Sequence, residues 1–183
     1  RSQVIDGSRV ADGDTVLGLA SNGVHSNGFS LVRRVVDRAG TQLDAPAPFD
    51  SRQSLGEALL AATRIYVKSC LAAIAAGDVR AIAHITGGGL VENIPRVVPD
   101  DLSVRLNLGA WPSLPVFDWI AETGLVPAGD MRRTFNLGIG MTLIISPDTY
   151  DPVVSVLCDA GEEVYEIGSI TTRGDGPDIV LVN

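Results

Sequence analysis

Short apolar runs bounded by Gly, Asp or Pro recur along the chain. Runs of this length predict buried or half-buried β-strands. We expect six strands, at residues 15–20, 81–86, 102–108, 140–146, 164–171 and 179–182. The turn-forming segment RGDGPD joins the last two, so we predict that they form an antiparallel pair.

Between the strands, apolar residues spaced three and four apart predict helices. In residues 29–39, Leu31, Val32 and Val35 share one side and charged residues lie opposite. Further helices are expected at residues 65–76, 90–97, 116–122 and 150–160. Because several strands are half-polar and helices separate them, we predict an α+β fold: a mixed β-sheet of about six strands with helices packed on it.

The charge balance excludes two classes of partner. The 183 residues include 14 basic and 22 acidic side chains, for a net charge of −8. Nucleic acids and anionic membranes bind basic surfaces, so we expect no nucleic acid and no membrane partner. Cys70 and Cys158 lie in apolar helical patterns without a CxxC motif, which predicts buried, reduced thiols. The sequence also lacks zinc, P-loop and GxSxG motifs, and we expect no metal site in this chain.

Two segments combine a strand end, a glycine-containing loop and a helix start. The first is ASNGVHSNGFSLVRR at residues 20–34, and the second is HITGGGLVENIPRVVP at residues 84–99. Helix N-termini present unpaired N–H groups, and glycines let an anion approach the backbone. The pattern therefore indicates a phosphate-bearing ligand, with plain turns and helix capping as alternatives. The candidate contacts are His25, Ser26, Asn27, Gly28, His84, Gly87, Gly88 and Gly89.

Five segments together resemble a known family. In chain order they are IDGSRVADGD, SNGVHSNGFSLVRR, TRIYVKSCLA, HITGGGLVENIPRVVP and FNLGIGMTLII. They are similar to the C-terminal domain of the phosphoribosylformylglycinamidine cyclo-ligase (AIR synthetase) family, over about residues 5–170. The chain departs from the family at Val24 and Ala62, where the family usually has proline, and this leaves the rigidity of these loops open.

The resemblance implies a ligase of purine biosynthesis in the cytoplasm. In that reaction ATP activates the formyl oxygen of formylglycinamidine ribonucleotide, and ring closure gives aminoimidazole ribonucleotide, ADP and phosphate. The resemblance also implies that residues 1–183 form a C-terminal domain. The N-terminal domain, which binds most of the ATP and Mg²⁺ and forms the homodimer, is then absent from this chain. We therefore expect the chain alone to be inactive and to expose an apolar patch that supports self-association.

The resemblance places the first loop at a cleft between domains. We therefore expect His25 to be catalytic, and its replacement to change stability by no more than about 1 kcal/mol because a ligand-facing side chain packs little. The further expected contacts with substrate or phosphate are Thr63, Arg64, Glu92 and Asn93. Those expected with the cofactor are Lys68 and Asn136.

Structural alternatives stay open at several of these positions. His25 could bond its own loop, His84 could be a core residue, and Lys68 could lie on a solvated helix face. The glycines at residues 138–140 suggest a close backbone approach or a tight bend.

Two other kinds of function are compatible with the sequence. The first is another ATP-dependent member of the superfamily, of the formylglycinamidine ribonucleotide synthetase, selenophosphate synthetase or thiamine-phosphate kinase type. The second is a non-catalytic lobe that only docks a partner domain. The string HITGGGLVENIPR favours the cyclo-ligase.

Overall fold

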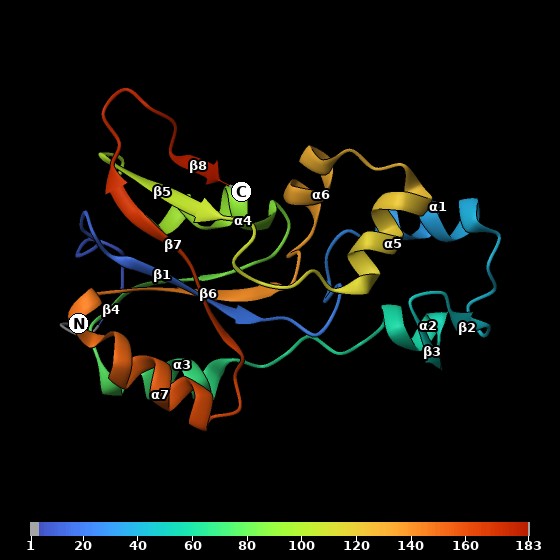
Figure 1. Ribbon diagram of the computed structural model, residues 1–183, viewed down its shortest axis with the longest axis horizontal. Coiled ribbons are helices and arrows are strands. Elements are labelled where there is room, and N and C mark those ends of the chain that lie inside the picture. The colour runs from blue at the N-terminus through green and yellow to red at the C-terminus, as the bar shows by residue number, and fades with distance from the viewer. Residues whose placement is uncertain (1–3, 183) are drawn as a thin grey trace.

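The computed structural model describes residues 4–182 of the chain. Its main sheet consists of β1 (Thr15–Ala20), β4 (Val79–His84), β5 (Leu102–Asn107), β6 (Ile139–Ile145), β7 (Val164–Thr172) and β8 (Ile179–Val182). The strand order is β4-β6-β1-β7-β5-β8, and all neighbouring pairs are antiparallel except β5 with β8. This mixed six-stranded sheet with packed helices confirms the predicted α+β class (Figure 1).

Helices cover both faces of the sheet. Helices α3 (Val67–Ala76) and α7 (Tyr150–Asp159) lie together on one face, below the sheet in Figure 1. There Leu17 and Leu143 of the sheet pack with Leu157 of α7. The opposite face buries Leu90 and Ile94, which belong to α4 (Gly89–Asn93) and its link to the short helix η1 (Pro95–Val97). Burial of apolar residues on both faces stabilises the sheet between two helical layers.

Four other helices pack with one another beyond one end of the sheet, at the right of Figure 1. They are α1 (Phe29–Ala39), α2 (Leu55–Leu59), α5 (Pro115–Gly124) and α6 (Ala128–Thr134). Their shared apolar cluster contains Phe117 and Phe135, whose ring centroids are 5.7 Å apart. The loop from β1 to α1 connects the sheet to this helical cluster. This loop therefore lies between the sheet and the helical cluster.

The sequence analysis did not predict several of the short elements. These are α2, α6 and the hairpin of β2 (Pro46–Ala47) and β3 (Asp50–Ser54). Each is too short or too polar to show a periodic apolar pattern, and Met131 is the one buried residue of α6. The start of α2 did carry a local signal, because Ser54 and Glu57 form a capping box.

The predicted antiparallel pairing of the last two strands is wrong. Strand β5 lies between them, antiparallel to β7 and parallel to β8. The connecting segment is bonded to β5: Val104 N–H donates to the Asp178 carbonyl at 2.9 Å, and Ser103 Oγ donates to the Pro177 carbonyl at 2.8 Å. These bonds carry the chain across β5 to its far edge.

The predicted burial of both cysteines holds for one of them. Cys70 is on the buried face of α3, whereas Cys158 is exposed on α7. Helix α7 buries Val153 and Leu157, so its neighbour Cys158 faces outward.

Candidate functional site

The loop between β1 and α1 is shaped by Asn136, which is 1% exposed. Its Oδ1 accepts hydrogen bonds from Ser21 Oγ at 2.7 Å and from the Gly138 N–H at 2.9 Å. Its Nδ2 donates to the Gly23 carbonyl at 2.9 Å. All of these bonds lie inside the fold, so Asn136 shapes the loop and is not placed to touch a cofactor.

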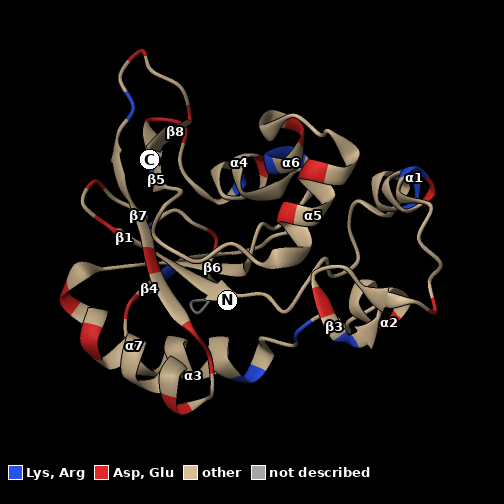
Figure 2. Cartoon of the chain, turned by 45° about the vertical axis from the view of Figure 1, so that its right-hand side comes forward, with Lys and Arg blue, Asp and Glu red and all other residues tan. Residues whose placement is uncertain are grey.

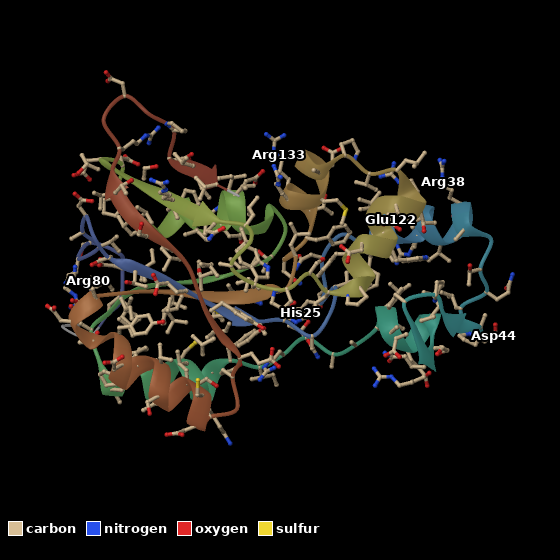
Figure 3. All side chains as sticks on the ribbon, in the orientation of Figure 1. His25, Arg38, Asp44, Arg80, Glu122 and Arg133 are labelled. Atoms are coloured by element: carbon tan, nitrogen blue, oxygen red, sulfur yellow. The ribbon has the colours of Figure 1, made fainter. Side chains whose placement is uncertain are left out.

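His25 lies inside this loop and not at its surface. The side chain is 3% exposed, and the backbone has φ 58°, a left-handed conformation that is unusual for a residue with a Cβ. Nε2 lies 2.8 Å from Asn22 Oδ1, so the residue does bond its own loop. Its other ring nitrogen, Nδ1, is buried and has no hydrogen-bond partner among the described residues. Figure 3 shows His25 where the sheet meets the helical cluster.

The surroundings of His25 favour its neutral form. Burial, with smaller contributions from electrostatic repulsion by His84 and Arg64, lowers the pKa of His25 from 6.5 to about 4. At pH 7 the ring is therefore uncharged. Asn22 Oδ1 can only accept, so the 2.8 Å contact places the proton on Nε2, and the Asn22 backbone N–H lies farther from Nε2 at 3.5 Å. Nδ1 is then left as an acceptor.

The next three residues do not cap α1 with their side chains. Gly28 is the N-cap residue in a left-handed conformation, φ 75°, and no side-chain capping bond is present. A Cβ at Gly28 would overlap the Phe135 ring, so this position requires glycine. Ser26 is exposed and its Oγ lies 3.1 Å from Thr63 Oγ1. The helix-capping alternative for Ser26 and Asn27 is thus not what the structure shows.

The glycine turn before α4 is held by Asn93, which is 5% exposed. Its Oδ1 accepts from Thr86 Oγ1 at 2.9 Å, and its Nδ2 donates to the carbonyls of Gly87 at 3.1 Å and Gly89 at 2.8 Å. Asn93 therefore stabilises this turn by side-chain hydrogen bonds, as Asn136 does in the first loop. Direct contact between Asn93 and a substrate is not supported by this position.

Two of the three glycines serve packing. Gly89 has φ 61°, and a Cβ there would overlap the Arg132 carbonyl oxygen at the end of α6. Gly88 N–H donates to the Arg133 carbonyl at 2.9 Å. Gly87 alone is exposed, and a methyl group on it would lie 3.8 Å from Asn27 Oδ1. The two loops therefore lie close to each other at Asn27 and Gly87.

Gly140 of β6 lies directly behind both loops. Its carbonyl accepts from Ile85 N–H at 2.9 Å, which fixes the strand before the glycine turn. A Cβ on Gly140 would overlap the Tyr66 hydroxyl and lie 2.8 Å from His25 Cε1. The sequence indicated a close backbone approach here, and Tyr66 and His25 are what approaches.

Beside the two loops is an open hollow of about 450 Å³ between α3 and the edge strand β4. Its lining includes Arg64, Tyr66, Leu71, Ile82, His84 and Met141. His84 is exposed and so is not a core histidine. Tyr66 is 2% exposed and its hydroxyl donates to the Ala20 carbonyl at 2.8 Å; burial raises its pKa, which keeps the donor proton in place. The lining of this hollow is therefore mostly apolar, and Arg64 and His84 are the polar side chains that it exposes.

Two other predicted site residues are not part of the two loops or the lining of the hollow. Lys68 is exposed on α3, and Glu92 is exposed on α4, where its Oε2 lies 3.5 Å from Arg96 Nη2. Within residues 4–182, no three or more His, Cys, Asp or Glu side chains come together as a metal site requires. The same residues include no helix long and apolar enough to span a membrane. Lys and Arg are spread over separate elements (Figure 2).

Comparison with known proteins identifies the family. Residues 11–179 match the family described as AIR synthase related protein, C-terminal domain, and the chain belongs to this family. The chain is 48% identical over 181 residues to phosphoribosylformylglycinamidine cyclo-ligase from Polaromonas sp. (strain JS666 / ATCC BAA-500). That match covers 99% of this chain and 51% of the relative, so the chain spans about half the relative's length.

Solved structures share the fold at low sequence identity. Thiamine-monophosphate kinase from Stenotrophomonas maltophilia K279a has a TM-score of 0.68 and 16% identity, over 99% of this chain and 54% of the kinase. Hydrogenase maturation protein HypE in complex with ATP has a TM-score of 0.55 and 18% identity, over 96% of this chain and 49% of HypE. These similarities describe the fold.

Proposed function

We propose that this chain is the C-terminal half of an ATP-dependent cyclo-ligase of purine biosynthesis. The longer protein would convert formylglycinamidine ribonucleotide and ATP to aminoimidazole ribonucleotide, ADP and phosphate. The observation that carries this proposal is the 48% identity to a cyclo-ligase over 99% of the chain. The meeting of the two loops at Asn27 and Gly87 supports it, because they form one polar surface for a phosphate-bearing substrate.

In this proposal the substrate's phosphate and ribose lie over the two loops. Ser26, Asn27, Thr63 and Arg64 supply donors, and Gly87 lets a ligand oxygen approach the backbone. His84, at the end of β4, extends this surface into the hollow. Gly28, Gly88 and Gly89 act by allowing the backbone to pack closely, and Asn93 and Asn136 act by holding the loops.

The proposed contribution of His25 is a hydrogen-bond acceptor. Its neutral ring with pKa about 4 is a weak base, so it suits orientation of an N–H group better than storage of a proton. Nδ1 is buried and has no partner among the described residues, so a substrate N–H would complete its bonding when the loop opens to admit it. The amidine of formylglycinamidine ribonucleotide carries such N–H groups.

ATP and Mg²⁺ belong to the proposal, with most of their contacts outside this chain. HypE, which shares the fold, has been solved in complex with ATP. No residue of this chain is assigned to Mg²⁺, because its carboxylates do not cluster within the described part. Lys68 is the remaining candidate for a contact with the nucleotide. The cytoplasm and a homodimer, with the N-terminal domain as partner, are likewise proposed from the cyclo-ligase relative.

The test is ring closure with a supplied N-terminal half. The N-terminal half of the Polaromonas cyclo-ligase would be mixed with or fused to this chain, and ADP and aminoimidazole ribonucleotide would be measured. We expect turnover with both halves and none with this chain alone. His25→Ala should lower turnover about tenfold or more, whereas Asn107→Ala on the exposed end of β5 should not change it. A correctly folded fusion without ring closure would refute the proposal.

The rival functions make different predictions in the same assay. A kinase of the thiamine-phosphate type would release ADP in the presence of thiamine monophosphate and form no aminoimidazole ribonucleotide. A docking lobe would bind the N-terminal half without changing its rate of ADP release. The higher identity to the cyclo-ligase, 48% against 16% for the kinase, favours the first function.

A further inference from the structure

A buried carboxylate lies behind the hollow, at a position that the sequence did not single out. Glu162 is 7% exposed and sits between α7 and β7. Ser69 Oγ donates to its Oε1 at 2.5 Å, and Arg64 Nε lies 3.0 Å from its Oε2. Burial of a carboxylate is unfavourable unless a cation and hydrogen-bond donors compensate for the lost water. Arg64 is that cation.

Arg64 is anchored along one edge of its guanidinium group only. Besides the ion pair at Nε, Nη2 donates to the Gly161 carbonyl at 2.6 Å. A guanidinium group has five N–H donors, and within residues 4–182 Nη1 has no hydrogen-bond partner. The side chain of Arg64 is 31% exposed and lines the hollow together with His84. The anchored edge of the guanidinium faces Glu162. Its other N–H groups remain free to donate to a ligand in the hollow.

The ion pair is also incomplete on the carboxylate side. The approach of Arg64 Nε to Glu162 Oε2 has the distance of an ion pair but not the angle of a hydrogen bond, so Oε2 has no hydrogen-bond donor among the described residues. The guanidinium is therefore held by charge at this end. The orientation of the guanidinium therefore depends on the position of the Glu162 carboxylate. The hydrogen bond from Ser69 Oγ fixes that position.

Secondary structure does not set the position of Arg64. It lies in the irregular segment between α2 and α3, at residues 60–66. Side chains hold this segment: Asn22 Nδ2 donates to the Ala62 carbonyl at 3.0 Å, and Tyr66 bonds the Ala20 carbonyl. Because no helix or strand orients Arg64, its direction follows from these contacts and from Glu162.

We propose that Glu162 is a positioning residue for phosphate binding. With Ser69 it holds the inner edge of Arg64, so that the outer edge of the guanidinium donates to a phosphate oxygen of the ligand. An arginine anchored in this way loses less side-chain freedom on binding than a free one. Glu162 acts through Arg64 and does not touch the ligand. This inference rests on the proposed function, in which the hollow and the two loops hold a phosphate-bearing substrate.

The first part of the test needs no ligand. The Nε signal of Arg64 is followed by ¹H–¹⁵N NMR in the 183-residue chain, where the Glu162 carboxylate 3.0 Å away shifts it from the position of a solvated arginine. We expect Glu162→Gln to move this signal to the position of a solvated arginine and Glu162→Asp to restore it in part. The matched control is Glu163→Gln. It removes the same charge from the next residue, whose side chain is exposed.

The second part is a titration with ribose 5-phosphate, with ribose as the uncharged comparison. Ribose 5-phosphate should shift the Arg64 signal in the wild-type chain and in Glu163→Gln. Glu162→Gln should bind about tenfold more weakly, the order expected when one charge-assisted hydrogen bond is misdirected. Ribose should shift the Arg64 signal in none of them. If Glu162→Gln does not fold, Ser69→Ala provides the second variant, because it keeps the carboxylate and removes its hydrogen bond.

Three outcomes would overturn the inference. These are an Arg64 signal that is unchanged in Glu162→Gln, equal ribose 5-phosphate affinity in folded Glu162→Gln and wild type, and no response of wild-type Arg64 to ribose 5-phosphate. None of them refutes the proposed cyclo-ligase, which is judged by ring closure with the N-terminal half. If ring closure fails but ribose 5-phosphate still shifts the Arg64 signal as expected, the chain has a phosphate site but not the proposed reaction.

Discussion

Ser21 Oγ donates a hydrogen bond of 2.7 Å to Asn136 Oδ1 across 115 positions of the chain. This bond joins the end of β1 to the segment that opens β6. The same asparagine bonds Gly23 and Gly138, so one buried amide sets the path of the loop that contains His25. The shape of the candidate site therefore depends on a residue that a ligand would not touch.

Replacement of this amide should cost stability. Asn136→Ala leaves the Gly23 carbonyl, the Gly138 N–H and the Ser21 hydroxyl without partners, and each unpaired buried group costs on the order of 1–3 kcal/mol. We expect the free energy of unfolding to fall by about 3 kcal/mol in urea denaturation followed by circular dichroism. Asn107→Ala removes one exposed hydrogen bond, from the Gly109 N–H, and is the control; it should cost no more than about 1 kcal/mol. Equal losses in both variants would refute this role.

The burial of His25 predicts a pH dependence of stability. Its folded pKa is about 4, below the ordinary value of 6.5, so the unfolded chain binds this proton more readily. The stability from the neutral ring is present above pH 6.5 and is lost as pH falls toward 4. By linkage the loss is about 2.5 kcal/mol at pH 4.5.

The contribution of His25 can be isolated by comparison with His25→Gln. Carboxylates also titrate in this range, so the difference between wild type and variant is the relevant quantity, measured by urea denaturation from pH 7 to 4.5. His84→Gln should keep most of the wild-type pH dependence, because burial is the main cause of the shift at His25. Identical curves for wild type and His25→Gln would contradict the prediction. The burial also replaces our first expectation that loss of His25 hardly affects stability, since that rested on an exposed side chain.

The glycine turn predicts a contrast between two Gly→Ala variants. Gly89→Ala places a Cβ onto the Arg132 carbonyl oxygen at φ 61°, so we expect a loss of about 3 kcal/mol or more. Gly129→Ala is in helix α6 with nothing within 4 Å of the added Cβ, so it should be neutral or stabilising by up to about 1 kcal/mol. Thermal unfolding measures both. A tolerated Gly89→Ala would show that α4 and α6 do not pack as described.

The face of α3 that borders the hollow predicts self-association. Val67, Leu71 and Ile74 are spaced along one side of the helix and are 62%, 61% and 39% exposed, and Ile65 just before it is 82% exposed. A contiguous apolar surface of this kind is unusual in a monomer. We expect light scattering to show association of the 183-residue chain that Leu71→Lys weakens.

The control for this surface is Leu125→Lys, at an exposed leucine outside α3. It adds the same charge and should not alter the association. A wild-type chain that stays monomeric at high concentration would contradict the expectation. So would equal association of wild type and Leu71→Lys, because contacts elsewhere would then hold the chains together.

The apolar pattern of the sequence alone determined the six strands, the main helices and the α+β class. This succeeded because burial leaves a local pattern: strands buried on both faces are short apolar runs, and helices repeat their apolar residues every three to four positions. The two glycine-containing loops were also visible, because each follows a strand and precedes a helix. The short segments α2, α6 and β2–β3 escaped, since tertiary contacts and not their own periodicity stabilise them.

Only the tertiary structure decided which residues face a ligand and which hold the loops. Asn93 and Asn136 look like binding residues in the sequence, because an amide has the same donors and acceptors whether it meets a substrate or a backbone carbonyl. Glu162 attracted no notice, since its partners Arg64 and Ser69 lie more than 90 positions earlier. The parallel pairing of β8 with β5 was likewise decided by hydrogen bonds to a distant strand. Contacts of this range leave no local pattern, because they depend on how the sheet brings separate parts of the chain together.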